Sequence, residues 1–130
     1  MIAVDTNILV RLLTADDLRQ TPKAQQLFDS ESIYLPKTVL LETAWVLEEL
    51  YHFDRATVLQ AFIKLVDFPD TTCEGDGQVR RALDWALGGM DLPDAMHLAS
   101  SHRCERFATF DRAFLKAARK ADTTPPVAAP

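Results

Sequence analysis

The sequence is poor in the residues that mark disulfide-stabilised, metal-finger or membrane proteins. Its 130 residues include two cysteines, Cys73 and Cys104, which lack the close spacing of metal-binding thiolates, so two reduced thiols are expected. No run approaches the ~20 uncharged apolar residues that a membrane helix needs. The N-terminus also has no basic region ahead of an apolar run, as a signal peptide would have. These absences favour a cytoplasmic protein with no membrane partner.

A surplus of basic residues is missing too. The chain has 14 Lys and Arg against 19 Asp and Glu, which gives a formal net charge of −5. Because proteins that bind nucleic acids usually carry a basic footprint, this balance argues at face value against a nucleic-acid partner. Net charge governs solubility and long-range steering, however, and does not decide what a local pocket binds.

What the chain does have is the composition of an ordinary globular domain, 48% hydrophobic and 25% charged. Its length suits one domain. We expect a single domain over residues 1–120. Residues 121–130, which are rich in threonine, proline and alanine, are expected to form a disordered tail.

Short apolar segments alternate with longer segments of helical period. The clearest helical pattern places apolar residues at i, i+3, i+4, i+7 and i+8 from Val79. Such an alternation predicts an α/β fold of three layers, in which about seven helices flank a mostly parallel sheet of about four strands. The strands that can be named are 2–4, 32–35 and 106–109, and the helices are 7–13, 21–30, 38–51, 54–68, 79–87, 91–101 and 112–120.

Four acidic residues occupy similar positions in this scheme. Asp5 follows the first strand and Asp111 follows the last, while Glu42 and Asp94 are expected in the first turns of helices. Ligands of open parallel sheets bind outside the carboxyl ends of the strands, so these side chains can converge if the strands are parallel. One acid alone has a simpler explanation, because it stabilises a helix dipole by roughly 0.3–1 kcal/mol. Four acids at such positions favour a site.

Grouped carboxylates predict a divalent metal ion. They repel one another, and without a counter-ion some would stay protonated. Oxygen ligands select hard ions such as Mg²⁺ or Mn²⁺, which keep several bound waters. Such an ion lowers the pKa of a bound water and clamps the oxygens of a phosphodiester. The predicted reaction is therefore phosphodiester hydrolysis that leaves a 5′-phosphate and a 3′-hydroxyl, and helix N-termini at the same edge would attract phosphate.

Four ordered motifs resemble PIN-domain nucleases, and more narrowly VapC, the toxins of prokaryotic type II toxin–antitoxin pairs. The resemblance runs from Met1 to about Lys120. The motifs are Asp5-Thr6-Asn7 after a strand, Glu42 in a helix after Pro36, Asp91-Leu92-Pro93-Asp94-Ala95-Met96-His97-Leu98-Ala99, and Thr109-Phe110-Asp111.

The resemblance implies both a site and partners. It implies Mg²⁺ as the cofactor, with Mn²⁺ able to substitute, and endonucleolytic cleavage of RNA. It also implies a homodimer and a cognate antitoxin, through which alone operator DNA would be bound. The implied catalytic and metal-binding residues are Asp5, Glu42, Asp94 and Asp111, and the supporting residues are Asn7, Asp91 and Thr109.

Basic residues gather near the end of the chain. Arg112, Lys116 and Arg119 recur at i, i+4 and i+7 of the last expected helix, beside Asp111. This pattern fits a strip of RNA phosphate contacts, and it equally fits a solvated face whose later cations suit a helix C-terminus. The candidate phosphate contacts are Arg112, Lys116 and Arg11, which lies one helical turn after Asn7.

Two other functions remain open. One is a catalytically silent dimer that binds an antitoxin and DNA, which the loss of an acid would have favoured. The other, less favoured, is an acidic-pocket phosphohydrolase. Phosphatases of the haloacid-dehalogenase type carry a second Asp two positions after the nucleophile, where this chain has Asn7.

Overall fold

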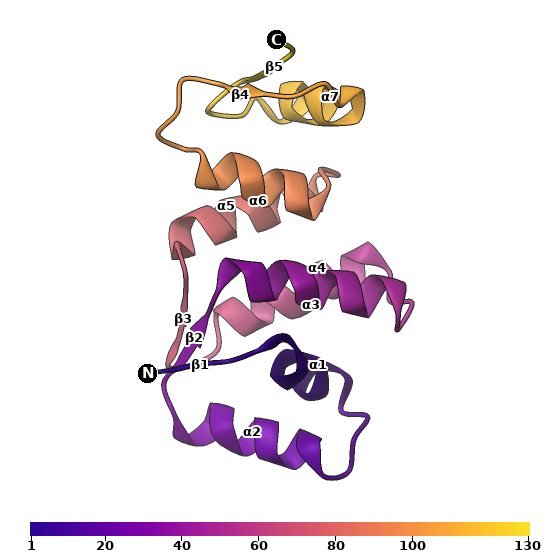
Figure 1. Ribbon diagram of the computed structural model, residues 1–130, viewed down its shortest axis with the longest axis vertical. Helices are drawn as coiled ribbons and strands as arrows, with labels where there is room; N and C mark the ends of the chain where they lie inside the picture. The colour runs from indigo at the N-terminus through magenta and orange to yellow at the C-terminus, as the bar shows by residue number, and fades with distance from the viewer. The chain divides into compact units, whose positions relative to one another are not determined.

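The computed structural model describes all 130 residues. The chain forms two compact units, Met1–Asp76 and Gly77–Pro130 (Figure 1). Each unit buries its own set of apolar side chains.

The first unit contains a three-stranded parallel sheet with the order β1-β2-β3. Ile33 of the central strand pairs with Ile2 on one side and with Thr71 on the other. The elements of this unit, in chain order, are β1 (Ile2–Ala3), α1 (Thr6–Thr14), α2 (Gln20–Ser30), β2 (Ile33–Leu35), α3 (Lys37–Glu49), α4 (Arg55–Val66) and β3 (Thr71–Cys73).

Apolar side chains hold the helices of the first unit against one another. Helix α1 packs against both α2 and α3, and α4 packs against α3 and β3 (Figure 1). Ile33 and Leu35 of β2 are fully buried, as expected for the central strand of a parallel sheet. Leu9 on α1 and Leu40 on α3 are buried as well. This packing fixes where the polar ends of α1 and α3 lie.

The second unit contains a two-stranded parallel sheet, in which Phe107 pairs with Val127. The ring of Phe107 lies 5.3 Å from that of Phe114, which ties β4 to α7. The elements are α5 (Asp76–Leu87), which begins at the last residue of the first unit, α6 (Leu92–Ser100), β4 (Phe107–Ala108), α7 (Arg112–Ala121) and β5 (Val127–Ala128).

The α/β class, the parallel strands and the seven helices are confirmed. The five strands lie in two sheets, whereas the sequence predicted about four strands in one. The prediction of a disordered tail over residues 121–130 does not hold for Val127–Ala128. This segment forms β5 because the backbone N–H groups of Phe107 and Thr109 donate to the carbonyl oxygens of Pro126 and Ala128, at 2.9 and 3.1 Å.

Two further expectations concern cysteine and the membrane. Neither Cys73 nor Cys104 forms a disulfide bond, as predicted. No helix has the length and the apolar character that crossing a bilayer requires.

Candidate active site

In the first unit, Thr6 links two of the predicted site carboxylates. Asp5 is the N-cap of α1, and its Oδ1 accepts a hydrogen bond of 2.7 Å from the backbone N–H of Thr6. The Thr6 hydroxyl donates to Oε1 of Glu42 on α3. Thr6 is buried, while both carboxylates are exposed. The packing of α1 against α3 therefore presents Asp5 and Glu42 together at the surface.

The position of Glu42 within its helix differs from the prediction. Helix α3 begins at Lys37 with Pro36 as its N-cap, so Glu42 lies in the second turn and not in the first. Its carboxylate therefore lies beyond the helix N-terminus and is bonded by the hydroxyl of Thr6. Thr6 was named only as part of the Asp5-Thr6-Asn7 motif, because its bond to Glu42 bridges 36 positions of the chain.

Asp5 and Glu42 line a groove of about 370 Å³. Asn7, predicted as a supporting residue, lies on its wall, and so does Arg11, predicted as a phosphate contact. The remaining lining residues are Thr6, Val10, Val46, Leu50 and Tyr51.

In the second unit, the predicted site residues Asp111 and Asp91 cap helices. Asp111 is the N-cap of α7, and its Oδ1 accepts hydrogen bonds from the backbone N–H groups of Ala113 and Phe114, at 2.9 and 3.1 Å. Thr109 accepts a hydrogen bond of 3.1 Å at its hydroxyl oxygen from the backbone N–H of Asp111. Because both capping bonds use Oδ1, the second carboxylate oxygen of Asp111 stays available to a ligand.

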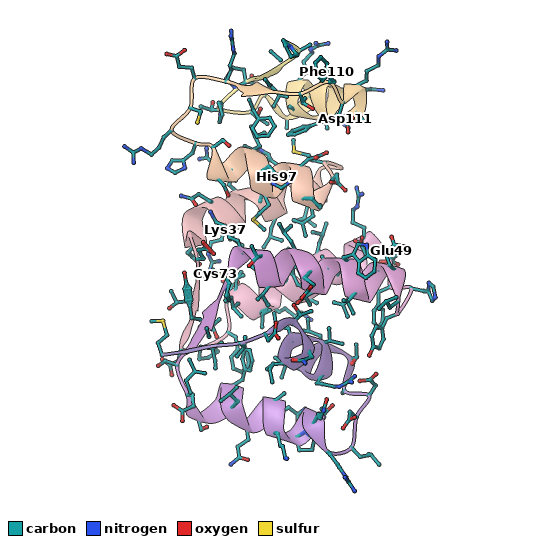
Figure 2. The ribbon with its side chains drawn as sticks, viewed as in Figure 1. Lys37, Glu49, Cys73, His97, Phe110 and Asp111 are labelled. Carbon is teal, nitrogen blue, oxygen red and sulfur yellow. The ribbon has the colours of Figure 1, made fainter.

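Asp91 plays the same part at the start of α6. Its Oδ2 accepts a hydrogen bond of 3.3 Å from the backbone N–H of Asp94. Asp94 itself caps nothing, and its half-buried side chain lies in the first turn of the helix, as predicted. His97 lies one turn further along α6, and Asp111 begins α7 in the same unit (Figure 2).

The pKa of Asp94 is raised above the ordinary value of aspartate. Partial burial is the largest cause, the negative charges of Asp91 and Asp111 add to it, and His97 opposes it. Partial burial beside two carboxylates disfavours a further negative charge. A cation bound at this position would remove the conflict, and the donor set of carboxylate oxygens suits a hard ion such as Mg²⁺ or Mn²⁺.

The predicted site residues are thus divided between the units. The first unit places Asp5 and Glu42 on one groove, and in the second unit the charges of Asp91 and Asp111 act on Asp94. Within neither unit do three His, Cys, Asp or Glu side chains form a group that could hold a metal ion by itself. A site that uses all four predicted ligands stays a prediction.

The basic residues of α7 are exposed. Arg112 directly follows Asp111, and Lys116 lines a hollow of about 400 Å³ with residues of α5 such as Asp84 and Trp85. Their predicted contact with RNA phosphates stays a prediction.

The fold is of the α/β class and carries the acidic residues Asp5, Asp94 and Asp111 at the starts of helices, as a metal-dependent enzyme can. A family model described as the PIN domain matches residues 2–120. This match covers nearly the whole chain, and the protein therefore belongs to the PIN domain family. PIN domains are typically metal-dependent nucleases, which places the chain among hydrolases that act on nucleic acids. No curated protein matches the sequence.

Replacing Thr6 with valine tests whether its hydroxyl positions Glu42. Thr6→Val keeps the size of the side chain but removes the donor to Glu42. We expect nuclease activity to fall roughly 10- to 100-fold, which is the usual cost of losing a residue that orients a metal ligand. The free energy of unfolding should fall by only about 1 kcal/mol.

The control is Thr6→Ser, which keeps the hydroxyl and should retain most of the activity. Cleavage rates and the Mn²⁺ concentration that gives half-maximal rate are measured for both variants. Wild-type behaviour of Thr6→Val, or equal losses in the two variants, would show that the hydroxyl does not position Glu42.

Proposed function

We propose that the protein is a Mg²⁺-dependent endoribonuclease and the toxin of a type II toxin–antitoxin pair, similar to VapC. One observation supports this proposal above the others. Partial burial and the negative charges of Asp91 and Asp111 raise the pKa of Asp94, in a chain that belongs to a family of metal-dependent nucleases. Repulsion among these negative charges favours a bound cation at this position.

The proposed metal ligands are Asp5, Glu42, Asp94 and Asp111. A bound Mg²⁺ would activate a water and offset the charge that develops on the phosphodiester. Thr6 holds Glu42 through its hydroxyl, and Thr109 fixes the backbone of Asp111. Asn7 lies on the groove beside Asp5, where its amide can hydrogen-bond to a substrate oxygen.

The proposed partners follow from the same assignment. RNA is the substrate, the protein acts in the cytoplasm as a homodimer, and it reaches operator DNA only through its antitoxin. The exposed carboxylates of Asp5, Glu42 and Asp111 suit a cationic inhibitor. We accordingly propose that the antitoxin docks with an arginine aimed at them, since its planar fork pairs with carboxylates.

Cleavage of total cellular RNA by purified, antitoxin-free protein tests the function. We expect discrete fragments with 5′-phosphate and 3′-hydroxyl ends in the presence of Mg²⁺ or Mn²⁺. EDTA should abolish them, and an excess of Mn²⁺ should restore them. DNA of the same sequence as a cleaved RNA should stay intact.

Three results would contradict this assignment in whole or in part. Fragments that persist in EDTA would exclude a metal-dependent reaction. The absence of cutting in tRNA, rRNA and mRNA with either metal would favour the catalytically silent module. Equal cleavage of DNA would leave a nuclease but remove the RNA specificity.

A further inference from the structure

We propose that Arg11 and Lys23 bind backbone phosphates of a nucleic-acid strand, along a path that leads from the Asp5–Glu42 pair across α1 to α2. The inference rests on the proposed function in taking a nucleic acid as the ligand. It goes beyond that function by assigning a binding path to the first unit. Lys23 has no role in the predicted site.

Two neighbouring hollows define this path. The groove that contains Asp5 and Glu42 has a volume of about 370 Å³, and a second hollow, between α1 and α2, has about 410 Å³. Asn7 and Arg11 line both hollows and so form the divide between them. Lys23 lies in the second hollow. A strand with one phosphate at the carboxylate pair can therefore continue past Arg11 towards Lys23.

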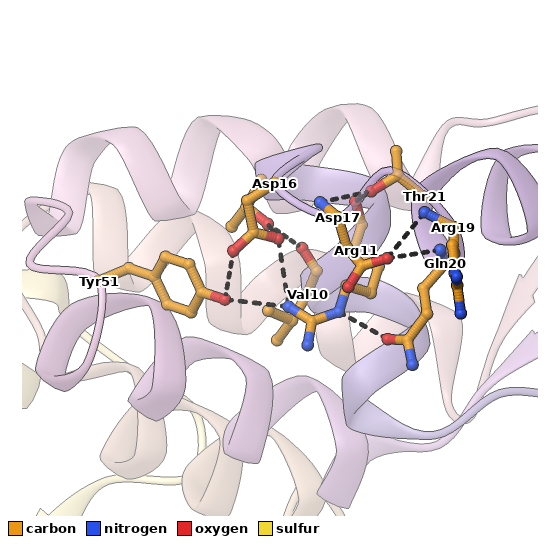
Figure 3. Close-up of polar contacts among 9 residues, drawn as sticks. Val10, Arg11, Asp16, Asp17, Arg19, Gln20, Thr21 and Tyr51 are labelled. Carbon is orange, nitrogen blue, oxygen red and sulfur yellow. Dashed lines mark hydrogen bonds and ion pairs between the residues drawn. The ribbon is translucent and has the colours of Figure 1, made fainter.

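The guanidinium of Arg11 is held in place before any ligand arrives. Its Nε donates to Oε1 of Gln20 at 2.7 Å, and its Nη1 donates to Oδ1 of Asp16 at 3.1 Å and to the hydroxyl of Tyr51 at 3.2 Å (Figure 3). The Tyr51 hydroxyl donates in turn to Asp16 at 2.8 Å. Thr14 adds a further bond to Asp16 at 2.8 Å.

These bonds leave Nη2 of Arg11 without a partner, as Figure 3 shows. The side chain of Arg11 is 29% exposed, so the edge of the guanidinium that carries Nη2 is accessible to a ligand. Because the side chain is already immobilised, binding a phosphate oxygen there costs little further conformational entropy. Asp16 neutralises part of the charge, but it occupies only one side of the guanidinium.

Lys23 differs from Arg11 in that it makes no hydrogen bond or ion pair. It projects from the exposed side of α2 with its full charge available. Arg11, with its open donor edge, lines both hollows, and Lys23, with its free charge, lines the second, in a chain of net charge −5. Their chemistry fits the regularly spaced anions of a nucleic-acid backbone and reads no base, since phosphate contacts carry no sequence information.

Binding measured without metal separates this inference from catalysis. The probe is a short fluorescein-labelled single-stranded RNA, followed by fluorescence anisotropy in EDTA over a series of salt concentrations. For single strands the slope of log affinity against log salt is about −0.7 for each phosphate neutralised. We expect Arg11→Ala and Lys23→Ala each to make this negative slope shallower by about 0.7. Each should also weaken binding about tenfold at low salt.

The control variant is Lys64→Ala, which removes an exposed cation of α4 in the same unit. Its slope should equal that of the unaltered chain. Arg11→Ala also removes three hydrogen bonds that join α1 to its neighbours, so thermal unfolding must accompany it. Lys23→Ala removes no bond, and it keeps the test decisive if Arg11→Ala does not fold.

The outcomes distinguish the two proposals. Reduced slopes in both variants support the phosphate path even if RNA is never cut, in which case only the nuclease assignment fails. RNA cleavage with unchanged slopes would retain the nuclease and overturn the path. Salt-independent binding, or an equal loss in Lys64→Ala, would also overturn it.

Discussion

Replacing Asp94 with asparagine is expected to reduce metal-dependent RNA cleavage by at least about a hundredfold. The side chain keeps its size but loses the charge that would hold the cation. Several kcal/mol of transition-state stabilisation depend on that cation, and each 1.36 kcal/mol corresponds to tenfold in rate. The measurement is the initial rate of cleavage at saturating Mn²⁺. Asp84→Asn, an exposed position on α5, is the matched control and should cleave normally.

The same substitution should stabilise the metal-free protein at neutral pH. The pKa of Asp94 is raised in the folded state by partial burial and by the carboxylates of Asp91 and Asp111. Its contribution to stability is therefore fully present below the unfolded-state pKa of about 3.9, and it is lost as the pH rises through the folded-state pKa. Asp94→Asn cannot ionise and escapes this loss.

Urea unfolding in EDTA at several pH values checks this expectation. The free energy of unfolding of Asp94→Asn should exceed that of the unaltered chain at neutral pH, and the difference should disappear at acidic pH. A variant that is inactive and also less stable at every pH would indicate damage to the fold. A variant with normal activity would remove Asp94 from the site.

At Asp111, charge and helix capping can be separated by comparing two substitutions. Asparagine caps helices about as well as aspartate, whereas alanine does not. Because Oδ1 of Asp111 accepts bonds from the backbone N–H groups of Ala113 and Phe114, Asp111→Ala should lower the free energy of unfolding by about 1 kcal/mol. Asp111→Asn should leave stability nearly unchanged.

The cleavage rates of Asp111→Ala and Asp111→Asn should not differ as their free energies of unfolding do. Both variants lack the carboxylate, so both should lose at least about a hundredfold in cleavage rate. Rates and thermal unfolding are measured side by side. If Asp111→Asn cleaves normally and only Asp111→Ala is impaired, Asp111 is a capping residue and has no part in catalysis.

The helices could be predicted because their pattern is local. The apolar positions of α5 follow the helical period, and Asp54 before α4 is a recognisable cap that accepts a bond of 2.8 Å from the N–H of Thr57. Among the short strands, β1, β2 and β4 lie within predicted segments, whereas β3 and β5 could not be predicted. In β3, Thr71 and Thr72 are polar, and β5 lies in a proline-rich tail that pairs with β4 only through tertiary folding.

The candidate site divides in the same way. The positions of three acids could be predicted because each belongs to a motif at an element boundary, and Asp5, Asp94 and Asp111 lie at helix starts in the structure. The contacts that position them could not. The bond from Thr6 to Glu42 spans 36 positions and the bond from Arg11 to Tyr51 spans 40, so both depend on how α1 packs.

The central proposal is that the predicted residues Asp5 and Asp94 take part in one metal-dependent cleavage reaction. Its most direct test compares the cleavage rates of Asp5→Asn, Asp94→Asn and the variant with both substitutions, at saturating Mn²⁺ and equal folded concentration. Residues that act as a unit have strongly non-additive effects. The account predicts that the double variant is no slower than the slower single variant. Losses that multiply, or a single variant with normal activity, would contradict it.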